Sequence, residues 1–372
     1  MSVIGNTALR FDDELAMLLE YARSFCRDHG GSERVRERLE TPQDFTPALW
    51  RQIVDMGWTG VGLPEDAGGS GLGIGAAVPL LESMGRALLG TPLMSSLLAS
   101  QLLLRAGGEA QTAALEALAG GRIAAVADIE SADRGGRCRS RVDGSGRVSG
   151  CKRLVADGAA AELFLVTARG EDGAEALALV PRSALREDAV TAAQLIDLTH
   201  RAADLQLDAV QAQQVLSGDA VSAALRDYRL LGALLVAAES AGAAAACLDT
   251  LVDYLKTRRQ FGRPIGSYQA LKHPAVEILA GVDNARSFVY HAATLLGSAP
   301  LDRDAEIACR MAKAQATQVL RYAGDRAVQF HGGMGFTWDC DAQLYLRRAQ
   351  WAQQQFGDAQ HHRRLLAALL LD

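Results

Sequence analysis

The sequence predicts an α+β protein in which a helical N-terminal domain and a helical C-terminal domain flank a middle β-sheet domain. Apolar residues recur every three or four positions in the first and last thirds, whereas the middle holds short apolar runs separated by turn residues. The chain has 372 residues, 49% of them hydrophobic, which suits a large core divided into roughly two or three domains. We expect the domains to span residues 1–120, 121–216 and 217–372.

The N-terminal third has the pattern of several helices interrupted by one glycine-rich loop. One helix face is predicted by apolar residues at i, i+4, i+8 and i+11: Phe45, Leu49, Ile53 and Met56. The stretch GLPEDAGGSGLGIG at 62–75 breaks this pattern, because its glycines permit positive φ and its proline stops a helix. Three further helices are expected within residues 76–88, 91–107 and 110–121.

The middle third, from Ile123 to about Val210, predicts a compact antiparallel sheet. Its clearest strands are AAVADI, RVSG, LFLVTA and ALALVP, at residues 124–129, 147–150, 163–168 and 176–181. Asp-Gly pairs at 143–144 and 172–173 are typical of the turns between strands.

Helices are expected again from Ser217 to the end of the chain. One face is predicted by spacing i, i+3, i+4 and i+7 at Leu248, Leu251, Val252 and Leu255. Later helices are predicted over residues 275–295, 304–329 and 343–371. The second of these should stop at Gly332-Gly333, since glycine is the usual C-terminal cap.

Composition excludes several classes of function. The formal net charge of −6 gives no reason to expect nucleic acid or an anionic membrane as a partner. The N-terminus lacks a cationic start followed by an apolar stretch, and the most apolar window, from Leu230, is broken by Glu239. We therefore expect a soluble, cytoplasmic protein in which this window forms a buried core helix.

The cysteines predict neither a metal site nor a disulfide scaffold. No CxxC pair occurs, so we expect reduced, mostly buried thiols at Cys26, Cys138, Cys151, Cys247, Cys309 and Cys340. The pair His361-His362 has no evident third metal ligand and predicts a solvated helix end. No metal is expected.

The segment YLKTRRQFGRPIGSYQALKH, at 254–273, is the most informative in the chain. A helix should end near Gln260, because Gly262 can adopt a left-handed cap and Pro264 forbids continuation. Arginines 258, 259 and 263 gather at this helix end. They could simply complement the helix dipole, or their guanidinium groups could bind an anion.

A second segment, AVQFHGGMGFTWD at 327–339, contains a cluster of glycines. Gly332, Gly333 and Gly335 would let the backbone approach a ligand closely, and the amide of Gln329 could bind a purine or ribose edge. A turn that ends a helix would explain the same glycines. We expect His331 to be a packing or backbone-bonded residue.

Together, in this order and in an α–β–α chain, RRQFGRPI and QFHGGMGF resemble the corresponding segments of the acyl-CoA dehydrogenase family. The resemblance covers nearly the whole chain, is strongest from about 230 to 336, and includes LPEDAGGSGLG near the N-terminus. It implies a C-terminal four-helix bundle and a flavoprotein, usually tetrameric, with FAD between subunits. Such enzymes remove two hydrogens from Cα and Cβ of an acyl-CoA thioester: a carboxylate takes the α proton, and the flavin takes the β hydride.

The resemblance also implies cofactor contacts that this chain would make to a neighbouring subunit. Arg258 matches the arginine that reaches the FAD pyrophosphate of the neighbour, with Gln260 and Phe261 beside it. Gln329 and the pair Gly332 and Gly333 match residues at the adenine and diphosphate end of the same FAD.

Contacts to a flavin in the chain's own β domain match the family poorly. The family's TEPxAGSD-like stretch is replaced by ADIESADRG at 127–135. In the family, a W/F-I-T element supplies an aromatic and a hydroxyl group to the flavin. At its place this chain has KRLVADG, in which Val155 and Ala156 offer neither group.

The family's catalytic base is also absent at both of its positions. In most members a Glu lies about 23 residues after the glycine pair, and this position is Phe356. In other members the Glu comes from the helix before the arginine motif, at the position of Gly232. Asp358 is a weak candidate for a base, and Glu239 is expected to be a structural carboxylate.

A chain that keeps the contacts to a neighbour's FAD but lacks the base resembles the shorter subunits of heteromeric, α2β2 bacterial acyl-CoA dehydrogenases of steroid breakdown. We therefore predict an FAD-dependent acyl-CoA dehydrogenase subunit that completes its partner's FAD site. The alternatives are a self-sufficient homotetramer with a non-standard base, a non-catalytic scaffold, and a different flavin reaction. The family implies an electron-transfer flavoprotein as electron acceptor.

Overall fold

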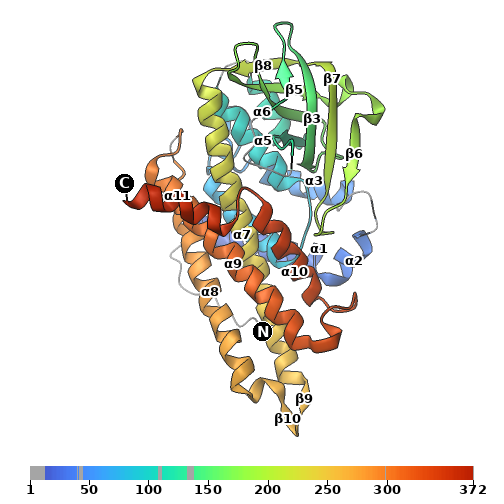
Figure 1. Cartoon of the computed structure of the whole chain (residues 1–372), viewed down its shortest axis with the longest axis vertical. Helices are drawn as coiled ribbons and strands as arrows, with labels where there is room; N and C mark the ends of the chain where they lie inside the picture. Colours follow the sequence, from blue (N-terminus) through green and yellow to red (C-terminus); the bar gives the residue numbers. More distant parts are fainter. Residues whose placement is uncertain are drawn as a thin grey trace.

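The computed structural model describes residues 13–39, 41, 45–107, 111–131, 138–297 and 299–371. Figure 1 shows the sheet at one end of an elongated molecule, the N-terminal helices beneath and beside it, and the long C-terminal helices extending to the other end. The predicted order of helices, sheet and helices is therefore confirmed.

The N-terminal region is helical as predicted. In α3, Pro47–Asp55, the side chain of Thr46 caps the helix by accepting the N–H of Leu49, and Leu49 and Ile53 are buried. Phe45, just before this cap, is also buried, whereas Met56 lies at the C-cap and is partly buried. The other helices are α1 (Asp13–His29), α2 (Ser32–Arg38), α4 (Ala77–Arg86), α5 (Leu93–Ala106) and α6 (Thr112–Ala119).

The middle region is a mixed sheet of eight strands, so the prediction of a purely antiparallel sheet is wrong. Its order is β6-β7-β3-β2-β4-β5-β8, and β1 pairs in parallel with β4, as does β2. Because β1 and β2 both run parallel to β4, they point in the same direction. A tight hairpin joins only antiparallel strands, so a longer connection is needed between β1 and β2. The strands are β1 (Ala124–Ala127), β2 (Arg141–Val142), β3 (Arg147–Ala156), β4 (Leu163–Arg169), β5 (Glu175–Pro181), β6 (Val190–Ala193), β7 (Ala202–Gln211) and β8 (Gln214–Ser217).

The C-terminal region is built on α7, Asp219–Thr257, a single helix of 39 residues. At a rise of about 1.5 Å per residue it is about 58 Å long. It is long and apolar enough to cross a membrane, but its apolar window is completely buried within the protein, as the prediction of a core helix requires. The helices that pack around it are α8 (Gln269–Thr294), α9 (Arg303–His331), α10 (Ala342–Gln354) and α11 (Ala359–Leu371).

Two of the predicted C-terminal helices differ from the structure. The helix predicted over 275–295 is present within α8, which begins earlier, at Gln269, and contains Pro274. The single helix predicted over residues 343–371 is wrong: α10 and α11 are separated by a turn in which Phe356 and Gly357 have φ of 53° and 96°. Left-handed residues cannot continue a right-handed helix.

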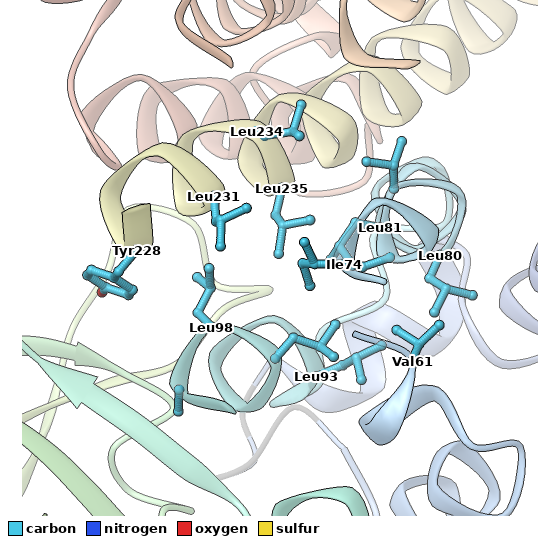
Figure 2. Packing of buried hydrophobic residues seen from close by; sticks show 14 of the residues in the cluster. Val61, Ile74, Leu80, Leu81, Leu93, Leu98, Tyr228, Leu231, Leu234 and Leu235 are labelled. Carbon is cyan, nitrogen blue, oxygen red and sulfur yellow. The ribbon is translucent and has the colours of Figure 1, made fainter. Parts of the chain in front are cut away.

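The core lies where α7 crosses the N-terminal helices. Figure 2 shows leucines of α7, including Leu231 and Leu235, extending toward Leu98 and Leu93 of α5. Backbones come close where α4 crosses α7: a Cβ on Gly85 would lie 2.0 Å from the carbonyl oxygen of Glu239, and one on Gly242 would lie 1.8 Å from that of Glu82. Only glycine fits at these two crossing points.

The cysteines are all free, and four of the six are buried: Cys26, Cys247, Cys309 and Cys340. Cys138 is partly buried and Cys151 is exposed. The prediction of unpaired, mostly buried thiols is confirmed.

Replacing Gly242 with alanine should destabilise the protein. The added methyl group improves helix propensity by about 1 kcal/mol, but it must displace the backbone of α4, and overpacking of this kind typically costs about 1–3 kcal/mol. We expect a lower thermal midpoint for Gly242→Ala than for the wild type. Gly297→Ala is the control, since a Cβ there meets nothing within 4 Å. Equal midpoints for the two variants would contradict the packing argument.

Candidate functional site

The arginine-rich segment forms a short β-hairpin at the C-terminal end of α7. Strands β9 (Arg259–Gln260) and β10 (Arg263–Pro264) pair antiparallel, and Phe261 and Gly262 between them have φ of 52° and 79°. Two left-handed residues are typical of a two-residue type I′ hairpin loop. The helix therefore ends at Thr257, not near Gln260 as predicted, and Phe261 at the tip is 91% exposed.

The arginines of this hairpin differ in what they contact. Arg259 donates to the carbonyl of Gly262 at 3.1 Å, and the guanidinium of Arg263 lies 4.0 Å from the ring centre of Tyr268. The backbone of Arg258 is bonded on both sides, yet its exposed guanidinium has no partner in the part of the chain that the structure describes. Arg258 is therefore available to bind an anion.

The glycine segment forms an open turn at the C-terminal end of α9. Helix α9 ends at His331 as the glycine pair predicts, and Gly332 has a φ of 61°. A Cβ on Gly332 or Gly333 would meet nothing within 4 Å, so their backbone is open to a ligand. Gly335 is different, because a Cβ there would lie 2.2 Å from the carbonyl oxygen of Val328.

The hairpin (residues 259–264) and the glycine turn (residues 332–335) lie at the same end of the helical region. The ring of Tyr254, near the end of α7, stacks on that of His331, the last residue of α9, with centroids 4.1 Å apart. All six predicted cofactor residues are solvent-exposed: Arg258, Gln260, Phe261, Gln329, Gly332 and Gly333. His331 is buried, with its Nδ1 2.7 Å from the carbonyl oxygen of Ala327, as the packing prediction requires.

A cavity of about 1020 Å³ lies at the opposite end of α7, between the sheet and the helices. Its walls come from the sheet, from α5, from the first turns of α7, and from the α10–α11 turn. None of the six predicted cofactor residues lines it. Tyr228, which does, precedes Arg258 by 30 residues along α7, a separation of about 45 Å in a helix. One flavin dinucleotide cannot reach both places in a single chain.

The two positions predicted for the family's base, 356 and 232, meet at the wall of this cavity. A Cβ on Gly232 would lie 2.3 Å from Cζ of Phe356, so the Phe356 ring lies directly against the α7 backbone. Tyr228 packs edge-on against the same ring, with centroids 5.5 Å apart. Both positions are thus filled by one phenyl ring, which cannot accept a proton.

Buried polar groups hold the α10–α11 turn in place. Lys313 of α9 is fully buried and donates to the carbonyls of Ala352 at 3.0 Å and Gly357 at 2.7 Å. The Nε2 atom of His362 lies 3.0 Å from the carbonyl oxygen of Phe356. Sequence reasoning missed Lys313; a single lysine among the alanines of MAKAQAT is the signal that could have indicated it.

The prediction that His361 and His362 form a solvated helix end is wrong for His362. Its side chain is buried, and burial together with the nearby Lys313 lowers the pKa of His362 to about 3, so the ring is neutral at physiological pH. Within the described residues, no group of three or more His, Cys, Asp or Glu could hold a metal.

The remaining carboxylates near the base positions have structural contacts. Asp358 is exposed, and its Oδ1 accepts the N–H of His361 at 2.7 Å at the start of α11, as an N-cap does. Glu239, expected to be structural, is buried and lies 2.7 Å from Nη1 of Arg348 and 3.2 Å from Nε2 of His200. Asp358 lines the same cavity as Phe356, but its Oδ1 is engaged by the N–H of His361, whereas Glu239 is paired with Arg348 and does not line the cavity.

The sheet wall of the cavity lacks the aromatic and hydroxyl groups that the family resemblance implies for flavin contact. Of the predicted pair, Ala156 lines the cavity together with Leu154, whereas Val155 is buried in the core of the sheet. The buried Lys152 donates to Glu130 at 2.6 Å and to Thr167 at 3.0 Å. Burial favours protonation of Glu130, but Lys152 and two backbone N–H groups lower its pKa to about 2, so Glu130 beside the cavity is ionised and paired with Lys152. Part of the ADIESADRG stretch, residues 132–135, lies outside the described residues.

Comparison with known proteins agrees with this geometry. The profile of the acyl-CoA dehydrogenase N-terminal domain matches residues 12–122, and that of the acyl-CoA dehydrogenase C-terminal domain matches residues 228–371. The chain is 32% identical to acyl-CoA dehydrogenase IpdE2 of Mycolicibacterium smegmatis over 96% of its own length and 98% of the relative. The chain belongs to the acyl-CoA dehydrogenase family.

Solved structures of this family include similar subunits of heteromeric complexes. A chain from a variant of the Tcur3481-Tcur3483 steroid ACAD superposes with a TM-score of 0.84 at 30% identity, covering 96% of this chain and 98% of that one. A chain of the ChsE4-ChsE5 complex of Mycobacterium tuberculosis gives a TM-score of 0.85 at 26% identity, covering 98% and 99%. Acyl-CoA dehydrogenases are FAD-binding oxidoreductases, and the predicted family resemblance is confirmed.

A buried ionic cluster joins the sheet region to the helices behind the cavity. Arg348 of α10 binds Asp197, which lies between β6 and β7, and Glu239 of α7, while His200 stacks on Trp351 with centroids 3.9 Å apart. Burial and Arg348 would lower the pKa of His200, but the carboxylates of Glu239 and Asp197 outweigh them and raise it above 6.5. When His200 is protonated, the positive charges of His200 and Arg348 balance the two negative charges of Glu239 and Asp197.

The charge on His200 predicts a loss of stability at alkaline pH. A group whose pKa is raised by folding stabilises the protein fully below its unfolded pKa, about 6.5 for His, and loses this contribution as pH rises through the folded value. The thermal midpoint of the wild type should exceed that of His200→Gln most at pH 6, and the gap should narrow toward pH 9. His291→Gln, at an exposed histidine, is the control. A gap that stays constant over this range would contradict the assignment.

Proposed function

We propose that this chain is the subunit of a heteromeric acyl-CoA dehydrogenase that completes the FAD site of an unlike partner and does not itself abstract the α proton. The observation that carries the proposal is the Phe356 ring against Gly232, which occupies both places predicted for a base, while the segments predicted to bind the cofactor are exposed. FAD, when bound, supplies the acceptor for the hydride removed from the acyl thioester.

The exposed half-site supports a contribution to another subunit. Arg258 offers an unengaged guanidinium that suits a diphosphate, and the backbone at Gly332 and Gly333 is open to close approach. These groups project from the end of α7 that is remote from the chain's own cavity. Gln260, Phe261 and Gln329 would complete the contact with the neighbour's FAD.

The lining of the internal cavity supports the absence of chemistry in this chain alone. A general base contributes roughly 10²–10⁴-fold, and only within hydrogen-bonding reach of the proton it removes. At the family's base positions the cavity presents Phe356, Gly232 and the adjacent Tyr228. A homotetramer made only of this chain would therefore need a base from another position, and Asp358 is already engaged as a helix cap.

The relatives support a role in the breakdown of steroid or other lipid acyl-CoA thioesters. One similar solved chain comes from a complex described as a steroid ACAD, and another comes from a complex of two differently named subunits. We infer a cytoplasmic α2β2 heterotetramer that passes its electrons to an electron-transfer flavoprotein. The experiment in the next paragraph distinguishes this heterotetramer from a homotetramer and from a non-catalytic scaffold.

The proposal predicts the flavin content of the purified protein. The chain expressed alone should show no absorbance near 450 nm, whereas co-purification with its dehydrogenase-like partner should give a yellow complex with about one flavin per two chains. A yellow chain that holds one flavin per subunit by itself would refute the half-site role and indicate a homotetramer. A colourless complex would indicate a scaffold.

Replacing Arg258 with alanine should weaken FAD retention by the complex without unfolding this chain. A hydrogen bond to a charged group is worth about 1.5–3 kcal/mol, which corresponds to at least about tenfold in the dissociation constant. Flavin occupancy after gel filtration and the thermal midpoint of the chain provide the two readouts.

The matched control is Arg51→Ala, which removes an exposed arginine of α3 far from the hairpin. It should leave flavin occupancy unchanged. Equal occupancy in Arg258→Ala and the wild type would remove Arg258 from the cofactor site.

A further inference from the structure

The hairpin and the glycine turn belong to different helices, so their spacing must be fixed if both are to bind one dinucleotide. Among the described residues, every hydrogen bond and ring contact of the hairpin stays within residues 254–268. None joins it directly to the glycine turn. The spacing must therefore be set by the helix ends from which the two segments emerge.

A stacked pair of rings joins these two helix ends. Tyr254 lies four residues before Arg258 in α7, and His331 immediately precedes Gly332. Their rings are 4.1 Å apart at an interplanar angle of 23°. This contact comes at the last turn of both helices, just before the chain enters the two binding segments.

Each ring belongs to a residue that is also bonded to the backbone of its own segment. The carbonyl of Tyr254 accepts the N–H of Arg258 at 2.9 Å, and the carbonyl of Arg258 accepts the N–H of Ile265, which closes the hairpin. On the other side, Nδ1 of His331 lies 2.7 Å from the carbonyl oxygen of Ala327, and its side chain is only 8% exposed. Both rings therefore belong to residues held in the last turns of α7 and α9, from which the two segments emerge.

We propose that Tyr254 and His331 are a positioning pair that sets the distance between Arg258 and the Gly332-Gly333 backbone, so that both contact the same FAD of the partner subunit. The inference rests on the proposed function and adds the residues that organise the half-site. The pair acts through Arg258 and the glycine turn, and neither ring needs to touch the cofactor.

Near this end of the helices, α7 and α9 also share buried small and aliphatic residues, which would hold the helices together without the rings. Leu251 on α7 and Leu320, Ala323 and Ala327 on α9 belong to one buried cluster. A purely structural role for the stack predicts a lower thermal midpoint with no specific link to Arg258. A positioning role predicts coupling to Arg258.

The test is a double-mutant cycle on the complex with its partner, read as the dissociation constant of FAD. Tyr254→Leu removes the ring, and Tyr254→Phe is the matched control that retains it. We expect Tyr254→Leu to weaken FAD binding at least tenfold when Arg258 is present and less than threefold in the Arg258→Ala background. Tyr254→Phe should bind FAD as the wild type does.

His331→Gln provides a second route to the same answer, since it removes the other ring and retains a side chain able to bond the backbone. It should reproduce the loss of affinity if Tyr254→Leu does not fold. Equal losses of affinity with and without Arg258, or wild-type affinity in both ring variants, would overturn the positioning role. If Arg258→Ala itself leaves FAD binding unchanged, the proposed function fails instead.

Discussion

The close crossing of α4 and α7 at two glycines is the constraint on which the rest of the structure depends. Gly85 and Gly242 bring the backbones into contact, which sets α7 in the middle of the protein and buries its apolar face on all sides. Because α7 continues without a break for 39 residues, it separates the cavity from the arginine hairpin by its whole length. The cavity lies at its start and the arginine hairpin lies beyond its end (Figure 1).

This long separation places the exposed hairpin and glycine turn far from the cavity and from the positions predicted for a base. The hairpin and glycine turn are exposed and depend on the ends of α7 and α9, whereas the base positions depend on the turn between α10 and α11. A phenyl ring at Phe356 is accommodated because Gly232 has no side chain and because Lys313 and His362 bind the carbonyls of the turn.

Sequence reasoning located the elements well and their pairings less well. The helix at Leu49 and Ile53, the end of α9 at the glycine pair and the two exposed motifs follow from local signals of periodicity, capping and turn residues. The parallel pairing of β1 with β4 depends on a long connection rather than on either strand. The break at Phe356 was missed because a left-handed phenylalanine has no local signature, although the following glycine offered a hint.

The sequence by itself determined the order of helical, sheet and helical regions, the family, and the absence of a carboxylate at position 356. These depend on residue identity and spacing, which the chain carries without reference to its fold. Only the tertiary structure decided that Phe356 and Gly232 meet, that His362 is buried and neutral, and that Tyr254 stacks on His331. Each of these contacts joins segments far apart in the chain, and their distances are set by how the long helices pack rather than by any local pattern.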